Sequence, residues 1–368
     1  MLRSVKLLGT GKYLPGDPVP FDQVEQVLGP IPGLSPRLQA YVDRMKPSMR
    51  KVIGMDYYYY ALDPKTRQPT ETLASMAAKA ARHALEEAAL EPGEIDLIAF
   101  GGPTTERLMS PCTSAFVQHE LGIESCAEVS VHANCTASYK AMEIAFDALR
   151  LGRHRTALVV SSCILSTLFR AEYFNPEKVT RNQALLRWFL CDGAGAMVLQ
   201  ATDEVDNGLY LEGVCNESVG GLMEPSMYTE LMANEILLPK VFETGAHHFT
   251  QDLRRVSEIG PGIFLEACRR MFGALDVEID SITYFLANIP NKLFWDAAIA
   301  QSKEKFGLDP SRFFSTLQDR GYCGPPAVII TMDDLLSRNQ TQPGEIIASV
   351  VTEASKWMNA GFYFKHRC

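Results

Sequence analysis

Short apolar segments alternate with longer amphipathic segments along this chain, and the alternation occurs twice. In the first half, the strand-like segments are residues 5–13, 97–102, 127–131 and 156–161, and the helix-like segments are 72–89, 114–121 and 136–151. In the second half, the strand-like segments are 210–214, 282–287, 346–351 and 361–364, and the helix-like segments are 262–272, 292–306 and 326–338. Apolar strands that alternate with helices are typical of parallel sheets covered on both faces. The sequence therefore predicts an α/β protein built from two similar βαβ-rich halves.

The boundary between the halves is expected near a polar connection at 201–207, which gives predicted domains of residues 1–203 and 204–368. Just before it, the glycine-rich stretch 192–196 is expected to form a turn that leads into a strand. Two segments interrupt the alternation. Residues 29–60, rich in Pro and ending in four tyrosines, are interpreted as an irregular insertion, and residues 217–252 as a loop or lid over a pocket.

The composition limits the classes of function. The chain has 368 residues, 46% hydrophobic and 21% charged, as expected for a soluble globular protein. Its net charge of −9 argues against binding to nucleic acid or an anionic membrane, because both need a positive field. Nine cysteines without a CxxC pair favour reduced thiols over disulfides or a zinc site. With no signal-peptide pattern or long apolar run, we expect a cytoplasmic enzyme without a metal.

The most informative segment is residues 129–138, where an apolar strand ends, a turn of small residues follows, and Cys135 stands at the start of the next helix. A helix N-terminus presents free N–H groups and a partial positive charge, which lower the pKa of a thiol and favour the nucleophilic thiolate. The same N–H groups can stabilise the oxyanion of a tetrahedral intermediate. Alternatively, Cys135 is simply a small buried hydrophobic residue.

Four segments in order, residues 94–100, 131–138, 155–162 and 191–196, resemble the ketosynthase III (beta-ketoacyl-ACP synthase III) branch of the thiolase superfamily, and the resemblance covers nearly the whole chain. It implies a thiolase fold, a five-layered α-β-α-β-α body. It also implies that Cys135 takes an acyl group from acyl-CoA or an acyl carrier protein as a thioester and passes it to an acceptor. No permanently bound cofactor is implied, since the substrate brings its own CoA or phosphopantetheine.

The chain departs from the family pattern in its second half. Phe285 stands at the His position of the family's His-x-Ala-Asn motif, and Cys323 is nearest to the Asn of a Tyr-Gly-Asn turn. Residues 352–357 replace a glycine-rich loop, so that Ala354 or Ser355 would supply the oxyanion N–H. Two missing donors worth roughly 2 to 4 kcal/mol each would slow ordinary decarboxylative condensation by orders of magnitude.

Other side chains could act as the base. Glu353 and His132 are candidates, and His247 with His248 could reach in from the irregular segment. Each also has a plainer interpretation, as a solvated Glu or as a hydrogen-bonded structural His. Asn288 matches the Asn of His-x-Ala-Asn and could hold a loop or a water near the pocket, or be an ordinary turn residue.

The main hypothesis is an acyltransferase or atypical condensing enzyme of polyketide or fatty-acid-derived specialised metabolism, acting on a small-molecule or carrier-bound acceptor. The alternative is a catalytically degenerate subunit that partners an active homologue. A thiolase that cleaves ketoacyl-CoA is a third possibility, for which Cys323 is the candidate second Cys. The resemblance implies a dimer, either of two copies or with a related subunit.

Overall fold

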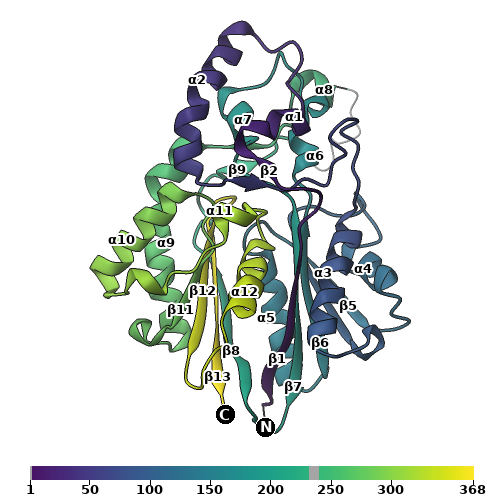
Figure 1. Cartoon of the computed structure of the whole chain (residues 1–368), viewed down its shortest axis with the longest axis vertical. Helices are drawn as coiled ribbons and strands as arrows, with labels where there is room; N and C mark the ends of the chain where they lie inside the picture. The colour runs from purple at the N-terminus through teal and green to yellow at the C-terminus, as the bar shows by residue number, and fades with distance from the viewer. Residues whose placement is uncertain (1, 232–239) are drawn as a thin grey trace.

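A computed structural model describes residues 2–231 and 240–368. At its centre is a sheet with the strand order β11-β12-β13-β8-β1-β7-β6-β4-β5 (Figure 1). The strands of this sheet are β1 (Ser4–Tyr13), β4 (Leu97–Gly102), β5 (Ala127–His132), β6 (Thr156–Cys163), β7 (Gly193–Thr202), β8 (Gly208–Ser218), β11 (Tyr284–Ala287), β12 (Ile346–Glu353) and β13 (Met358–Arg367). Within the described ranges, no helix has the length and apolar character needed to cross a membrane.

The sheet consists of two groups of strands joined by a short contact. β1 and β8 pair only at Val5↔Leu211 and Lys6↔Tyr210. On one side the order is β5-β4-β6-β7-β1, and on the other it is β11-β12-β13-β8. Beside β11, on the outer side, Phe313 forms a single parallel bridge with Phe285. This bridge takes the place that β5 has in the first group, so the two groups share one strand order. The domain boundary at 203/204 falls between β7 and β8 and stays a prediction.

The expectation of parallel sheets is wrong, because the sheet is mixed. β4 pairs parallel with β5 and β6, and β11 pairs parallel with β12, whereas the other pairs of the large sheet are antiparallel. Between β12 and β13 only residues 354–357 intervene, and such a short link cannot make the crossover that parallel neighbours need.

Three layers of helices alternate with the two groups of strands, which makes five layers. The outer face of the first group carries α3 (Leu73–Glu87) and α4 (Thr113–Leu121). Between the two groups lie α5 (Ala137–Arg150) and α12 (Ala327–Arg338), and the far face carries α9 (Leu253–Leu275) and α10 (Lys292–Phe306) (Figure 1). Small residues allow the closest contacts of these layers. A Cβ at Gly9 or Gly11 of β1 would overlap the backbone of the Ala-rich α3.

A fourth apolar cluster forms a cap at one end of the layers, at the top of Figure 1. Its short elements are β2 (Val19–Pro20), α1 (Val24–Leu28), β3 (Tyr57–Tyr58), α6 (Ser166–Phe169), α7 (Arg181–Leu186), β9 (Met227–Tyr228), α8 (Val241–Thr244) and β10 (Thr250–Gln251). The segment expected as a loop or lid contributes β9, α8 and β10 to it, and its residues 232–239 lie outside the described residues.

The cap also contains α2 (Pro36–Ile53), which corrects the expectation of an irregular insertion at 29–60. Ser35 caps α2 by accepting a hydrogen bond from the Leu38 N–H, and Gly54 ends it at φ 71°. Pro47 inside the helix disguised these signals, because an internal Pro normally interrupts a helix.

The glycines at 193 and 195 lie within β7 rather than in the expected turn. A Cβ at Gly193 would lie 2.9 Å from the Cys323 sulfur, and one at Gly195 would lie 2.7 Å from Cβ of Ile329. The glycines are therefore needed where α12 and the loop before it press on the strand.

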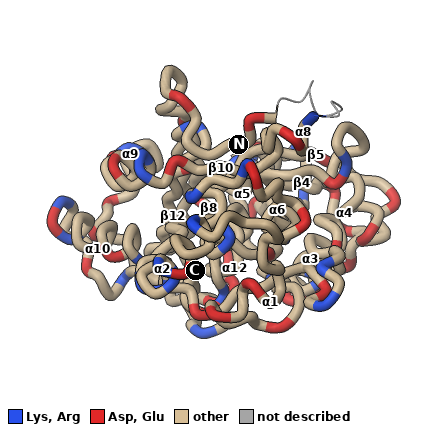
Figure 2. Tube along the Cα trace, turned by 90° about the horizontal axis from the view of Figure 1, so that it is seen from above, with Lys and Arg blue, Asp and Glu red and all other residues tan. Residues whose placement is uncertain are grey.

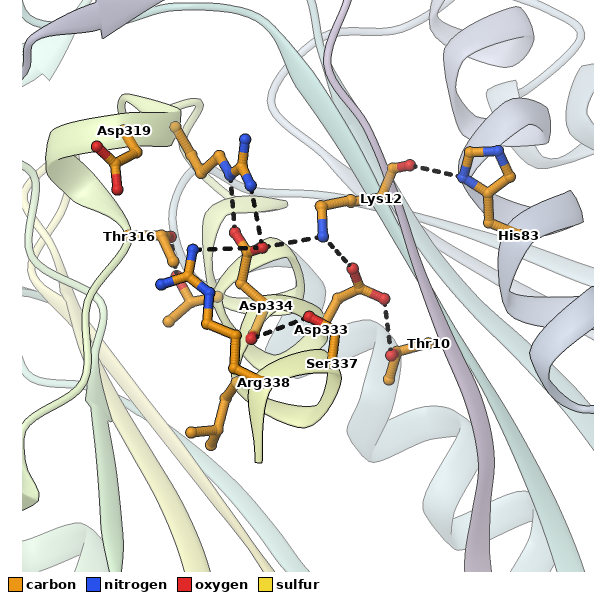
Figure 3. A network of polar contacts seen from close by, with 12 residues as sticks. Thr10, Lys12, His83, Thr316, Asp319, Asp333, Asp334, Ser337 and Arg338 are labelled. Carbon is orange, nitrogen blue, oxygen red and sulfur yellow. Dashed lines mark hydrogen bonds and ion pairs between the residues drawn. The ribbon is translucent and has the colours of Figure 1, made fainter. Parts of the chain in front are cut away.

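A network of charges ties that loop to α12 and to β1 of the first group of strands (Figure 3). Asp334 of α12 is 2% exposed and accepts from Lys12 of β1 at 3.0 Å. It also accepts two hydrogen bonds from Arg320, at 2.9 and 3.2 Å, and Arg338 lies 3.8 Å away. The network thus fixes the backbone that leads into residues 321–326.

Candidate active site

A cavity of about 310 Å³ lies between the cap and the ends of the strands. Its walls come from α2, α9 and α10 and from the loops after β4, β5, β11 and β12. Most lining side chains are apolar, and those of the three helices include Met45, Met49, Val256, Phe264, Leu293 and Phe294. Among the described residues, the lining contains no Lys, Arg, His, Asp or Glu. Charged residues of both signs lie instead on the outer turns of these helices (Figure 2).

Cys135 borders this cavity from the turn between β5 and α5. Thr136, the residue before α5, donates its backbone N–H to Glu353 Oε2 at 3.0 Å and its hydroxyl to the same oxygen at 2.5 Å. The N–H of Ala137 is donated to the Asn134 carbonyl at 2.8 Å. These N–H groups at the helix start therefore have other partners than the Cys135 sulfur.

The surroundings of the thiol reverse the expected shift of its pKa. Burial, followed by the nearby charge of Glu353, raises the pKa of Cys135 to about 12, while a hydrogen bond with Tyr322 and the Cys135 backbone N–H lower it. The expectation that the helix start lowers this pKa is corrected, because its N–H groups are engaged elsewhere and a carboxylate accompanies them. At neutral pH the thiol of this structure is protonated.

Glu353 is the last residue of β12 and is 1% exposed, so it is not the solvated Glu of the plainer interpretation. Its second carboxylate oxygen accepts from the Ser355 hydroxyl. Ala354 lines the cavity, and the carbonyl of Ser355 accepts from the Ser226 N–H at 3.0 Å. A role for Glu353 as the base, and for the Ala354 or Ser355 N–H at an oxyanion, stays a prediction.

Phe285 is not at the cavity. Its ring packs in the outer core against Phe272 and Phe313, at centroid distances of 5.5 and 5.1 Å. Asn288, the first residue after β11, reaches the cavity instead and is 8% exposed. The side chain of Phe285 points to α9 from within the strand, and its correspondence to the family's His stays a prediction.

The loop 321–326 also presents a different residue from the expected one. Cys323 is buried against Gly193 and is absent from the described cavity lining, whereas its neighbour Tyr322 lines the cavity. Tyr322 was missed in the sequence. Which of two adjacent loop residues turns inward depends on the backbone, here held by the Cys191 N–H donating to the Tyr322 carbonyl at 3.0 Å.

The three candidate histidines lie elsewhere. His132 is exposed, with its Nε2 2.8 Å from the Pro103 carbonyl. His247 lies 2.7 Å from the Tyr173 carbonyl, and His248 accepts from the Asn175 N–H at 2.9 Å. Burial lowers the pKa of His248 to about 4. The cavity lining that the structure describes contains none of the three.

Comparisons with known proteins agree with the sequence resemblance. A family model, 3-oxoacyl-(acyl-carrier-protein) synthase III, matches residues 129–212, which include the turn with Cys135. The beta-ketoacyl-(acyl-carrier-protein) synthase III of Neisseria meningitidis is 26% identical over 352 residues, 94% of each chain. That of Clostridium acetobutylicum is 22% identical over 351 residues, 95% of each. Over nearly its whole length, the chain is similar to the beta-ketoacyl-(acyl-carrier-protein) synthases III.

Solved structures confirm the thiolase fold of this ketosynthase III relative. AbyA1, a tetronic acid condensing enzyme, superimposes with a TM-score of 0.79 at 24% identity, over 98% of this chain and 99% of its own. OleA of Xanthomonas campestris gives a TM-score of 0.79 at 19% identity, over 99% of both chains. Cys135 lies inside the range 129–212 that the family model matches, whereas Asn288, Tyr322 and Glu353 lie outside it.

Proposed function

We propose that this chain is an acyltransferase or atypical condensing enzyme that forms an acyl thioester on Cys135 and passes the acyl group to a second substrate. The observation that carries the proposal is the position of Cys135 at the wall of a largely apolar cavity, whose described lining contains no charged residue. Such a cavity suits an uncharged acyl chain, because burying its apolar surface away from water is favourable. A carboxylate-bearing acyl unit would lie there without a cation to pair with.

The reaction needs two acyl transfers, of which the first is a thioester exchange. In the first, a bond forms between the Cys135 sulfur and the acyl carbon, the bond from that carbon to the CoA or phosphopantetheine sulfur breaks, and the thiol proton ends on the departing thiol. In the second, the nucleophile of the acceptor takes the acyl group and its proton returns to Cys135. Neither step changes an oxidation state.

Two neighbours support the choice of substrates. One OleA structure contains lauric acid and lauroyl-CoA, and AbyA1 is described as a condensing enzyme. We propose by analogy that an acyl-CoA or acyl carrier protein brings the chain and that the acceptor belongs to fatty-acid-derived or polyketide specialised metabolism.

Intact-protein mass spectrometry after incubation with a panel of acyl-CoA and acyl-carrier thioesters tests the proposal. We expect a gain of one acyl group that disappears in Cys135→Ala. Cys163→Ala is the matched control, because Cys163 lines the same cavity and is not the proposed nucleophile. A gain that persists in Cys135→Ala would overturn the assignment of the nucleophile.

A second candidate function, a degenerate partner subunit, is favoured by one observation, the raised pKa of the Cys135 thiol. The edge strand β5, with Ala127, Glu128, Ser130 and His132 exposed, is where we propose that a second subunit pairs. The absence of loading by every donor, together with a stable complex with a related chain that does load, would support this function over the first.

A further inference from the structure

We propose that Tyr322 is a catalytic residue whose hydroxyl donates a hydrogen bond to the Cys135 sulfur as negative charge develops on it. The inference rests on the proposed acyl transfer at Cys135. The sequence resemblance expects a His and an Asn as the polar groups of the site, and the described cavity offers Asn288 and Tyr322.

The backbone around Tyr322 is held on three sides. The Cys191 N–H donates to its carbonyl at 3.0 Å, and the Ser138 hydroxyl, from the first turn of α5, donates to the Pro325 carbonyl at 2.8 Å. Upstream, Arg320 makes its paired hydrogen bonds to Asp334. One of these attachments is to the same helix start that carries Cys135, so the two residues keep their relative positions.

The side chain of Tyr322 is 4% exposed and borders the same cavity as Cys135. The interaction of its hydroxyl with the thiol lowers the pKa of Cys135. Burial, followed by the nearby Cys135, raises the pKa of the Tyr322 hydroxyl well above its usual value. The hydroxyl therefore keeps its proton and acts as a donor rather than a base.

Two neighbouring polar side chains, those of Tyr139 and Glu353, are engaged elsewhere, whereas Asn288 Nδ2 has no partner among the described residues. The Tyr139 hydroxyl lies 2.6 Å from the Ser349 hydroxyl. Both oxygens of Glu353 accept from Thr136 and Ser355, and a carboxylate would in any case repel a thiolate. Of the two donors left at the cavity, Tyr322 rather than Asn288 is the one whose interaction lowers the pKa of the Cys135 thiol.

The proposed hydrogen bond from Tyr322 acts both when Cys135 is loaded and when it passes on the acyl group. During loading, the Sγ–C bond forms while the donor C–S bond breaks, and the thiol proton ends on the departing thiol. During transfer, Cys135 is the leaving group, the Sγ–C bond breaks, and the sulfur regains a proton from the acceptor. Preorganised donors to such charges accelerate reactions by about 10²–10³-fold when they are backbone or amide groups acting on oxyanions. Because sulfur is a weaker acceptor, we expect about tenfold here.

Tyr322→Phe, which removes only the hydroxyl, tests the inference. The readout is the rate at which iodoacetamide alkylates Cys135 between pH 7 and 10, followed by mass spectrometry. We expect a rate about tenfold lower at each pH, as for a thiol pKa about one unit higher. Tyr60→Phe is the control, since the Tyr60 hydroxyl is buried with no partner among the described residues. Alkylation of Tyr322→Phe at the wild-type rate would overturn the inference.

A second replacement protects against a folding artefact. Difluorotyrosine at position 322 keeps the ring and makes the hydroxyl a stronger donor, so alkylation should become faster than in the wild type. Slower alkylation in both forms would reveal a packing effect and overturn the inference. Alkylation also needs no acyl donor. If no donor loads but Tyr322→Phe still slows alkylation, the proposed acyl transfer fails and the role of Tyr322 stands. If Cys135 loads and Tyr322→Phe changes neither loading nor alkylation, the acyl transfer stands and the role of Tyr322 fails.

Discussion

The nucleophile turn and the segments that face it differ in how they relate to the ketosynthase III family. The turn, residues 132–138, lies within the family match and ends in a helix start as the resemblance predicts. The facing segments are the ends of β11 and β12 and the loop 321–326 before α12. They present Asn288 and Tyr322 to the cavity, with Glu353 beneath the helix start.

This difference teaches that the position of a nucleophile does not determine its acidity. A helix start normally favours a thiolate. Here the facing segment β12 brings a carboxylate to those N–H groups, and burial with this charge raises the pKa of the Cys135 thiol. The predictions below change the facing side and leave the turn intact.

The largest effect is expected from Asp334→Ala, which disconnects the loop of Tyr322 from α12. Burial raises the pKa of Asp334, but hydrogen bonds from Arg320 and Lys12 outweigh it and hold that pKa below its usual range. The contribution of Asp334 to stability is therefore present at neutral pH and is lost as the pH falls through the acid range. Removing it leaves cations without their partner, so the free energy of unfolding at pH 7 should fall by about 3 kcal/mol.

Urea unfolding at pH 7 measures this change. The control is Asp296→Ala, which breaks an exposed pair with Lys292 and should cost no more than about 0.5 kcal/mol. If the two variants were equally stable, the network of Figure 3 would not be what holds the loop.

A smaller effect, about tenfold in rate, is expected from Glu353→Gln. Removing the charge should lower the pKa of Cys135 by about one unit and speed its alkylation at pH 8 about tenfold. In the wild type, the rate should rise with pH and show no plateau below about pH 10, because the thiol pKa is about 12. Ser355→Ala is the matched control, since it removes a hydrogen bond to Glu353 and keeps the charge.

Acyl loading separates the two roles open to Glu353. If it only repels the thiolate, Glu353→Gln should load faster as well as alkylate faster. If it is the base, loading should fall although alkylation rises. An alkylation rate equal to that of the wild type would contradict the electrostatic explanation of the raised pKa.

The sequence predicted what depends on local pattern. β1, β12 and α12 could be placed because their periodicity and end signals lie within each segment. α2 was missed because Pro47 lies between its Ser and Gly boundaries. The start of β7 at Gly193 was taken for a turn, because this glycine is needed for close contact with Cys323 and not for a turn.

The candidate site could be predicted only in part, for a related reason. Cys135 was identified from the turn around it. Tyr322 and the position of Glu353 depend on contacts between segments far apart, such as the bond between Thr136 and a carboxylate 217 residues later. Single-sequence patterns carry no information on such pairs, so the correspondence of Phe285 and Cys323 to family positions could not show that the described cavity lining contains neither residue.

The smallest effect concerns the far wall of the cavity, which should set chain length rather than reactivity. Val256 of α9 is 7% exposed and lines the cavity, so Val256→Phe should shorten the space for the acyl chain. We expect a few-fold shift toward shorter acyl-CoA donors in a competition experiment read by intact mass, with Cys135 alkylation unchanged. Overpacking of this kind costs about 1–3 kcal/mol of stability, which the protein should tolerate.

Val205→Phe, at an exposed site outside the described cavity lining, is the control. An unchanged chain-length preference would mean that the acyl chain does not extend toward α9, and the uncharged cavity would then have to be explained by the acceptor.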